Sequence, residues 1–113
     1  MNAQWIGIPW VRVGDSFDGC DCWGLVRLFY RDRLGIELPS LTEFDAMRGI
    51  WTRTATPEYG NILLFRRSNG PHVGIVVNEC DMLHVDESID SRIEQYRGLL
   101  WKHRLKTVYQ YSA

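Results

Sequence analysis

The first extended pattern of apolar and polar residues along the chain is helical, and it begins at Cys22. The side chains that share one helical face by their i, i+3, i+4 and i+7 spacing are Cys22, Leu25, Val26 and Phe29, followed by Arg33. Asp21 stands where an N-cap residue accepts backbone N–H groups, and Gly35 stands where a left-handed residue ends a helix. We therefore predict an amphipathic helix that starts at Cys22 and ends before Gly35.

After Pro57 the pattern changes to short apolar runs separated by turn residues, which is typical of strands. The expected strands are residues 61–66, 72–78, 82–86 and 105–111, with turns at 68–71 and 78–81. Residues 42–49 and 95–102 have patterns compatible with short helices. A helix followed by a mostly antiparallel β-meander predicts a compact α+β fold.

The length and composition predict one globular domain that covers residues 1–113. The chain has 113 residues, 45% of them hydrophobic and 24% charged, and its net charge is −1 with basic residues only in short clusters. Neither nucleic acid nor another polyanion is therefore an expected partner. The sequence has no apolar run long enough for a membrane span and no secretory signal pattern at its N-terminus. We expect synthesis in the cytoplasm, no membrane partner, and export only by lysis, a phage particle or a secretion machine.

Cys22 is the candidate nucleophile. It occupies the first turn of the predicted helix, where unpaired N–H groups and the helix dipole stabilise an anion. This position is expected to lower the pKa of the thiol and to make it reactive near neutral pH. The same N–H groups can bind the oxyanion that forms when the sulfur attacks an acyl carbon. The alternative interpretation is a small apolar side chain buried in the core.

His72 and His84 are the candidate partners of Cys22, on two strands of a predicted hairpin. If the hairpin is centred on Asn78, the two imidazoles face each other on one side of the sheet. His72 is then the general base for Cys22, and His84 orients it. If the centre falls between Asn78 and Glu79, the histidines lie on opposite faces and no triad forms. They are then two unrelated residues, one at a strand start and one half-buried.

The three cysteines exclude a complete set of intrachain disulfides and fit a reducing compartment. A zinc site made of Cys20, Cys22, Cys80 and the two histidines is disfavoured, because Cys-x-Cys spacing crowds a tetrahedral ion. We therefore expect no metal and no organic cofactor. The adjacency of Cys20 to Cys22 also raises the hypothesis of a reversible oxidation partner.

Three residues near Cys22 in the sequence are candidates for substrate binding: Trp10, Asp21 and Trp23. An indole ring buries a large area and serves a core as readily as a cleft wall, so packing is the alternative role of both tryptophans. Asp21 is most simply a helix cap, because its charge beside a thiolate would oppose a lowered pKa of the thiol. We expect its carboxylate to accept backbone N–H groups.

Several short segments resemble, in order, the motifs of the NlpC family of cell-wall cysteine peptidases. Residues 21–28 (Asp-Cys-Trp-Gly-Leu-Val-Arg-Leu) resemble its nucleophile motif, and most closely the branch found among phage tail assembly proteins, where Trp commonly follows Cys. Residues 7–10 resemble its Gly-x-Pro-Tyr segment, and residues 60–65 its Gly-Asp-hydrophobic strand. Residues 72–75 resemble its His-Val-Gly-Ile motif, and His84 matches the position of its third polar residue.

The resemblance implies a papain-like fold, with the nucleophile helix packed on the sheet. It also implies a hydrolase that cuts peptidoglycan peptides, typically beside a D-glutamyl residue, with Cys22 as nucleophile, His72 as base and His84 as third residue. A phage or prophage tail, with other tail proteins as partners, is the implied setting, and the virion tail or the host cell wall and periplasm are the implied destinations. The alternatives are a structural tail-assembly component that keeps the fold, and another thiol amidase or acyl transferase.

The chain departs from the family pattern in three places. Trp10 replaces the usual Tyr, residues 12–15 contain one Gly where two are usual, and Pro71 replaces the Ser that commonly precedes the base. No departure removes Cys22, His72 or His84. Each is expected to affect the activity or the shape of the substrate cleft.

Overall fold

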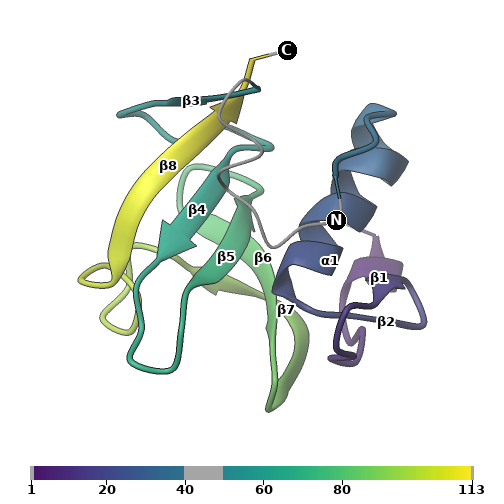
Figure 1. The fold of residues 1–113 in the computed structure, drawn as a ribbon. Helices are drawn as coiled ribbons and strands as arrows, with labels where there is room; N and C mark the ends of the chain where they lie inside the picture. Colours follow the sequence, from purple (N-terminus) through teal and green to yellow (C-terminus); the bar gives the residue numbers. More distant parts are fainter. Residues whose placement is uncertain (1, 40–49, 113) are drawn as a thin grey trace.

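The computed structural model describes residues 2–39 and 50–112, and in this part of the chain one α-helix packs beside an antiparallel sheet (Figure 1). A 3-10 turn, η1 (Ala3–Trp5), precedes the hairpin of β1 (Asp15–Ser16) and β2 (Gly19–Cys20). The helix α1 (Cys22–Phe29) continues as the π-helical turn η2 (Tyr30–Leu34). The later strands are β3 (Trp51–Arg53), β4 (Ile62–Phe65), β5 (His72–Val76), β6 (Asp81–Asp86), β7 (Ile89–Gln95) and β8 (Leu105–Tyr111). The predicted α+β fold is confirmed.

The sheet has the strand order β3-β8-β4-β5-β6-β7, and every neighbouring pair is antiparallel. Strands β4 to β6 form the expected meander, β7, which was not predicted, continues it, and β8 returns along the open edge of β4 (Figure 1). The four predicted strands correspond to β4, β5, β6 and β8, and β8 has the predicted bounds. β3, which was not predicted, extends the sheet beyond β8.

The helix begins and ends as predicted from the sequence. The side chain of Asp21 caps its first turn, and Gly35 ends the helical segment with a left-handed φ of 67°. Leu25, Val26 and Phe29 are buried on the face that packs against the sheet. The predicted helix of residues 42–49 lies outside the described residues.

The sheet carries a hydrophobic cluster on each face, because alternate residues of a strand point to opposite sides. On the helix side of the sheet, the cluster contains the strand residues Ile62, Val73, Ile75, Leu83 and Val85. The other cluster consists of Leu63, Phe65, Val76, Met82, Tyr96, Trp101 and Val108. His72 pairs with Phe65 in the β4–β5 ladder, so its side chain shares the face of the second cluster.

The predicted helix of residues 95–102 is wrong. Residues up to Gln95 belong to β7, and turns follow as far as Arg104. Leu99 and Leu100 gave this segment its apolar pattern, but they are 85% and 64% exposed and therefore pack on nothing. Tyr96 and Trp101 are the buried residues of this segment, and two side chains five positions apart do not make the continuous apolar face that so short a helix needs.

The register of the β5–β6 hairpin differs from both alternatives considered for it. Val76 pairs with Met82, which centres the hairpin on Glu79. This centre is one residue beyond Asn78 and keeps His72 and His84 on one face, but it places them diagonally and not directly opposite each other. The reason is the turn, where the Asn78 side chain accepts hydrogen bonds from the N–H groups of Cys80 and Asp81 at 2.9 Å.

Candidate active site

Cys22 is held at the tip of α1 by its neighbours in the chain. The Asp21 carboxylate accepts a hydrogen bond from the N–H of Gly24 at 2.7 Å and another from the N–H of Val13 at 2.9 Å. Gly24 lies so close to the preceding loop that a Cβ on it would stand 1.7 Å from the carbonyl oxygen of Gly14. The expected capping role of Asp21 is therefore confirmed, and the cap also ties the loop to the helix.

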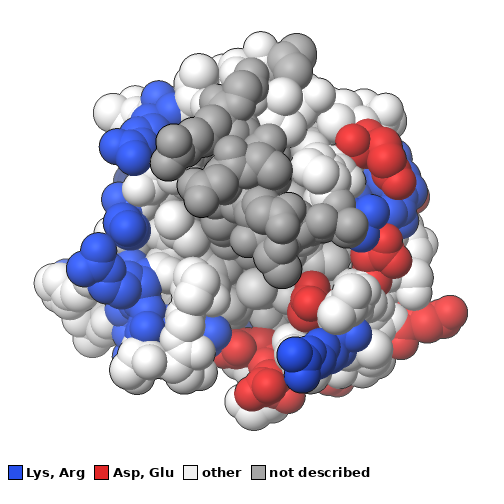
Figure 2. All heavy atoms as spheres, in the orientation of Figure 1, with Lys and Arg blue, Asp and Glu red and all other residues white. Residues whose placement is uncertain are grey.

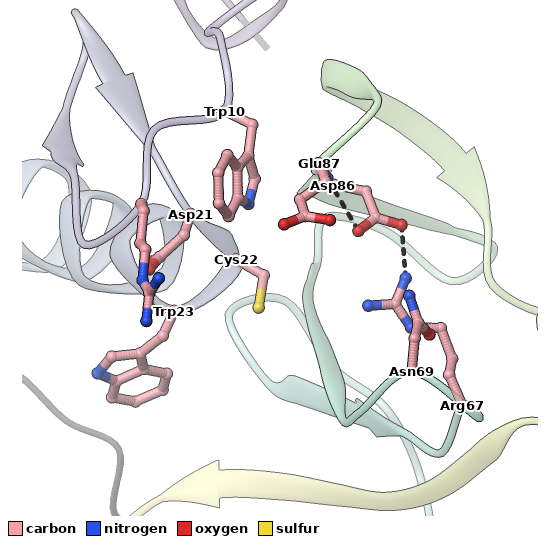
Figure 3. A pocket seen from close by; sticks show the side chains of 9 residues that line it. Trp10, Asp21, Cys22, Trp23, Arg67, Asn69, Asp86 and Glu87 are labelled. Carbon is pink, nitrogen blue, oxygen red and sulfur yellow. Dashed lines mark hydrogen bonds and ion pairs between the residues drawn. The ribbon is translucent and has the colours of Figure 1, made fainter.

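The thiol of Cys22 points into a cleft with a volume of about 340 Å³ (Figure 3). The residues that line it are Trp10, Arg12, Asp21, Cys22, Trp23, Arg67, Asn69, Asp86 and Glu87. All three predicted substrate-binding residues are among them, and the indole rings of Trp10 and Trp23 flank the sulfur in Figure 3. The Trp23 indole N–H donates to the carbonyl of Pro39 at 3.0 Å, which fixes the ring at the wall of the cleft.

The expectation of a lowered Cys22 pKa is wrong for the protein without substrate. Burial raises the pKa of the Cys22 thiol above its ordinary value of 9.0, and the charge of Asp21 adds to that rise. Hydrogen bonds from the backbone of Val73 and Trp23, together with the charge of Arg67, act in the opposite direction but do not prevail. Desolvation of the thiolate thus exceeds the stabilisation that the helix terminus provides.

The structure brings His72 and His84 together in a buried chain of side chains. His72 Nε2 lies 2.9 Å from His84 Nδ1, and His84 Nε2 lies 2.8 Å from a carboxylate oxygen of Glu94. The second oxygen of Glu94 accepts a hydrogen bond from the indole N–H of Trp101 at 3.4 Å. Trp101 also stacks on the His72 ring, with 5.2 Å between ring centroids. Both histidines are 1% exposed and Trp101 is 6% exposed, so the network of four side chains reaches solvent only at Glu94.

His72 is a neutral imidazole with one unused nitrogen. Burial, with contributions from His84 and Arg67, lowers the pKa of His72 to about 3. Its Nδ1 is buried without a hydrogen-bond partner among the described residues. The Cys22 thiol lies against the backbone N–H of Val73, the residue after His72. The Cys22 sulfur thus lies at the start of β5, where His72 is the first residue, and no hydrogen bond joins the sulfur to the His72 ring among the described residues.

Charged residues of both signs surround the cleft. Arg67 forms an ion pair with Asp86, and the two side chains are only 16% and 23% exposed. Figure 3 shows this pair on the side of the cleft opposite Trp10 and Trp23. Over the visible face, Lys and Arg line the β8 side, and the α1 side carries Asp and Glu interleaved with further Lys and Arg (Figure 2). A cleft lined by positively and negatively charged side chains suits a substrate that carries groups of both signs.

Sequence reasoning missed seven residues of this site. Five of them line the cleft, namely Arg12, Arg67, Asn69, Asp86 and Glu87, and two belong to the histidine network, namely Glu94 and Trp101. The signal that could have identified Glu94 is strand β7, which was not predicted. Arg92 pairs with His84, and Glu94 is two residues further along β7, so Glu94 lies on the same face of the sheet as His84. Among the described residues, no group of three or more side chains is arranged to hold a metal ion. Likewise, no helix in the described ranges is both long and apolar enough to cross a membrane.

Comparisons with known proteins identify the family of the chain. The profile of the NlpC/P60 family matches residues 7–110. A "Probable endopeptidase" of Haemophilus influenzae is 37% identical over 87 residues, which are 74% of this chain and 54% of that protein. The Murein DD-endopeptidase MepS/Murein LD-carboxypeptidase of Escherichia coli strain K12 is 31% identical over 103 residues, which are 90% of this chain and 55% of that protein. The chain spans about half the length of these curated relatives.

Solved structures show the same fold. The NlpC/p60 domain of the peptidoglycan hydrolase SagA superposes with a TM-score of 0.73 at 19% identity, covering 95% of this chain and 90% of that domain. An NlpC/P60 family protein from Bacillus cereus superposes with a TM-score of 0.77 at 19% identity, covering 96% of this chain and 37% of that one. With a family match across most of its length and this shared fold, the chain belongs to the NlpC/P60 family.

Proposed function

We propose that the chain is a cysteine endopeptidase that hydrolyses peptide bonds of bacterial peptidoglycan through an acyl-enzyme. The observation that carries the proposal is the placement of Cys22 at a capped helix terminus within an open cleft, beside a strand whose first residue is a buried, neutral histidine. A thiol, a base and a residue that orients the base are the parts that acyl transfer requires.

The reaction begins from uncharged partners, because burial raises the pKa of the Cys22 thiol and lowers that of His72. The thiol transfers its proton to His72 Nδ1 as the sulfur attacks the carbonyl carbon. The imidazolium that forms is supported through its Nε2 by His84 and, beyond it, by Glu94. N–H groups at the start of α1 stabilise the oxyanion. His72 then returns the proton to the leaving amine, and water hydrolyses the thioester by the reverse sequence.

The substrate is a cell-wall peptide, on the strength of the relatives. The Escherichia coli protein is named a murein DD-endopeptidase and LD-carboxypeptidase, and the SagA domain belongs to a peptidoglycan hydrolase. Peptides of the wall carry both free amines and carboxylates, and the cleft offers Asp21, Asp86 and Glu87 together with Arg12 and Arg67. We propose cleavage beside a D-glutamyl residue as the preferred bond, with Trp10 and Trp23 against the stem peptide.

The test is digestion of purified peptidoglycan and of isolated stem peptides, followed by mass spectrometry of the products. Wild-type protein is expected to release fragments whose masses identify the bond, and Cys22→Ala and His72→Ala are expected to release none. Thermal unfolding of both variants checks that the fold is intact. Products from the folded Cys22→Ala variant would exclude the mechanism, and cleavage at a D-alanyl bond would exclude only the proposed D-glutamyl preference.

We further propose that the protein acts in a phage or prophage tail, after synthesis in the cytoplasm. The support is the Asp21-Cys22-Trp23-Gly24 motif, which resembles the tail-assembly branch of the family. The expected result is detection of the chain by mass spectrometry in purified virions or induced tail particles. Detection only in the cell envelope, at constant level after prophage induction, would contradict the tail setting. A protein that is assembled into tails yet cuts no peptidoglycan would support the structural alternative.

A further inference from the structure

Glu94 ends a hydrogen-bonded chain that starts at the proposed base. Its side chain is 25% exposed, while that of His84, which it contacts at 2.8 Å, is 0% exposed. In the ladder of β6 and β7, Met82 pairs with Glu94 and His84 with Arg92, so the carboxylate stands diagonally next to the His84 ring on the same face. The same diagonal relation joins His84 to His72 on β5, which makes one row across three strands.

The direction of the hydrogen bonds in this row follows from the chemistry of its last member. An ionised carboxylate only accepts hydrogen bonds, so His84 Nε2 must be the donor. A neutral imidazole has one N–H, so His84 Nδ1 is then an acceptor and His72 Nε2 donates to it. His72 Nδ1 is left as a bare lone pair, and it is the buried atom without a partner among the described residues.

We propose that Glu94 is a positioning residue that sets the tautomers of both histidines, so that His72 presents an unprotonated Nδ1 to the Cys22 thiol. Glu94 touches neither the substrate nor the sulfur, and acts through His84. The catalytic consequence rests on the proposed function, but the assignment of the protons does not. With the opposite tautomers, His72 Nδ1 would carry a proton and could not accept one from the thiol.

Trp101 makes an amide a poor substitute for the carboxylate. Its indole N–H donates to one oxygen of Glu94 while His84 uses the other, so both positions require acceptors. In Glu94→Gln only one of the two atoms is an acceptor. When the amide oxygen accepts from Trp101, the amide nitrogen faces His84 Nε2 and donates to it. Both histidines are then expected to reverse their tautomers.

The experiment is nitrogen NMR of imidazole-labelled protein, which identifies the protonated nitrogen of each ring without any substrate. We expect Nε2–H on both rings in the wild type and Nδ1–H on His72 in Glu94→Gln. In the double variant Glu94→Gln/Trp101→Phe the competing donor is gone, so the amide oxygen can turn to His84 and the wild-type tautomers should return. Glu79→Gln is the matched control, since this side chain is exposed at the turn of the β5–β6 hairpin.

Kinetics supply the second readout. Loss of the correct tautomer is expected to lower kcat by about 10²-fold or more while KM changes little, because general-base catalysis is lost and binding is not. The acid limb of the pH profile should move to lower pH, since Glu94 favours the charged form of His84. The other charged groups that act on the two rings, Arg67, Asp86 and Arg92, remain in place.

Nδ1–H on His72 in the wild type, or tautomers that stay unchanged in Glu94→Gln, would overturn the inference whether or not the protein cuts peptidoglycan. A kcat for Glu94→Gln equal to that of Glu79→Gln would overturn the positioning role. If the tautomers reverse as expected but the wild type cuts no wall peptide, the proposed function fails and the assignment of Glu94 stands.

Discussion

His72 and His84 are joined by a 2.9 Å contact between ring nitrogens although they are diagonal neighbours in the sheet. Val76 pairs with Met82, and the same register continued along the strands places Gly74 opposite His84. A Cβ on Gly74 would stand 3.5 Å from the His84 Cβ and 2.8 Å from the Met82 sulfur. Gly74 therefore leaves the space beside both imidazoles without an intervening side chain, and the diagonal pair can meet there.

The burial of Cys22 predicts that its side chain is a thiol, and not a thiolate, in the protein without substrate. Because burial raises the pKa of Cys22 above 9.0, alkylation of Cys22 by iodoacetamide should be slow at neutral pH and should still accelerate with pH beyond that value. The measurement is the rate of modification of Cys22 against pH, followed by mass spectrometry of peptides. A fast rate that is independent of pH near neutrality would instead indicate a preformed thiolate–imidazolium pair.

The other two thiols serve as references in that experiment. Cys80 is exposed, so the measurement is made in a Cys80→Ser background to remove its reaction. Cys20 is fully buried, and burial raises its pKa to about 12, so it should remain unmodified as long as the protein is folded. Modification of Cys20 would reveal unfolding and invalidate the data at that pH.

The buried histidines predict a loss of stability on mild acidification. The pKa of His72 is lowered to about 3 in the folded protein from 6.5, so between these values only the unfolded chain takes up the proton. Stability is therefore complete above about pH 6.5 and falls as the pH decreases, by at most about 1.4 kcal/mol per pH unit for one such group. The lowered pKa of His84 acts in the same direction.

Urea unfolding at several pH values between about 7 and 4.5 measures this slope. The lower limit avoids the range in which Asp86, whose pKa is lowered by its hydrogen bond with Arg67, also begins to contribute. His72→Gln should reduce the slope, and His103→Gln should not, because His103 is exposed. A stability that is constant over this range would mean that the two histidines are not neutral in the folded state.

The close approach of Gly24 to the preceding loop predicts a large loss of stability when a methyl group is added at Gly24. A Cβ at this position would stand 1.7 Å from the carbonyl oxygen of Gly14, and a backbone atom cannot move aside as a flexible side chain does. Gly24→Ala should therefore cost about 3 kcal/mol or more, which is at the upper end for overpacked sites. Thermal unfolding measures it, and Gly35→Ala, whose Cβ would meet nothing within 4 Å, gives the cost of a side chain at a left-handed φ without any steric contact. Equal losses in the two variants would mean that the helix does not press on the loop.

Much of the fold could be predicted from short sequence segments, because caps, turn residues and the spacing of apolar residues determine these elements locally. The start of α1 follows from the Asp21 cap and the spacing of apolar residues after Cys22, and the end of η2, which continues α1, follows from Gly35. β8 was predicted with its bounds because alternation over residues 105–111 reflects a strand with unlike faces. That Trp10 and Trp23 flank the thiol was anticipated from the resemblance and from their nearness in sequence.

What escaped prediction depends on contacts between distant segments. The hairpin register was set by an Asn78 side chain that caps the turn, and a one-residue slip in the pairing of the two strands would move one histidine to the opposite face. The link from His84 to Glu94 requires the pairing of β6 with β7, a strand that sequence patterns did not reveal. The raised pKa of Cys22 depends on burial, which competes with the helix terminus and has no signature in the local sequence.

The left-handed backbone conformation of Val13, at the edge of the site, predicts that a substitution there will stabilise the protein. Its φ is 63°, a left-handed conformation that is strained for a β-branched residue, and its side chain is 76% exposed. The strain is tolerated because its N–H donates to Asp21 at 2.9 Å, which ties the loop to the helix cap. Val13→Gly keeps that hydrogen bond and relieves roughly 2 kcal/mol of strain, against about 1 kcal/mol for the greater freedom of Gly in the unfolded chain.

The expected net gain of about 1 kcal/mol corresponds to a rise of roughly 4 °C in the unfolding temperature. Val11→Gly in the same loop is the matched control, and it should be destabilising because it adds backbone freedom to the unfolded chain and removes the contact of the Val11 side chain with Gly19. Unfolding temperatures that fall equally in both variants would show that Val13 is not strained. A gain in stability without a change in Cys22 reactivity would show that the loop can relax while the Asp21 cap continues to hold the nucleophile.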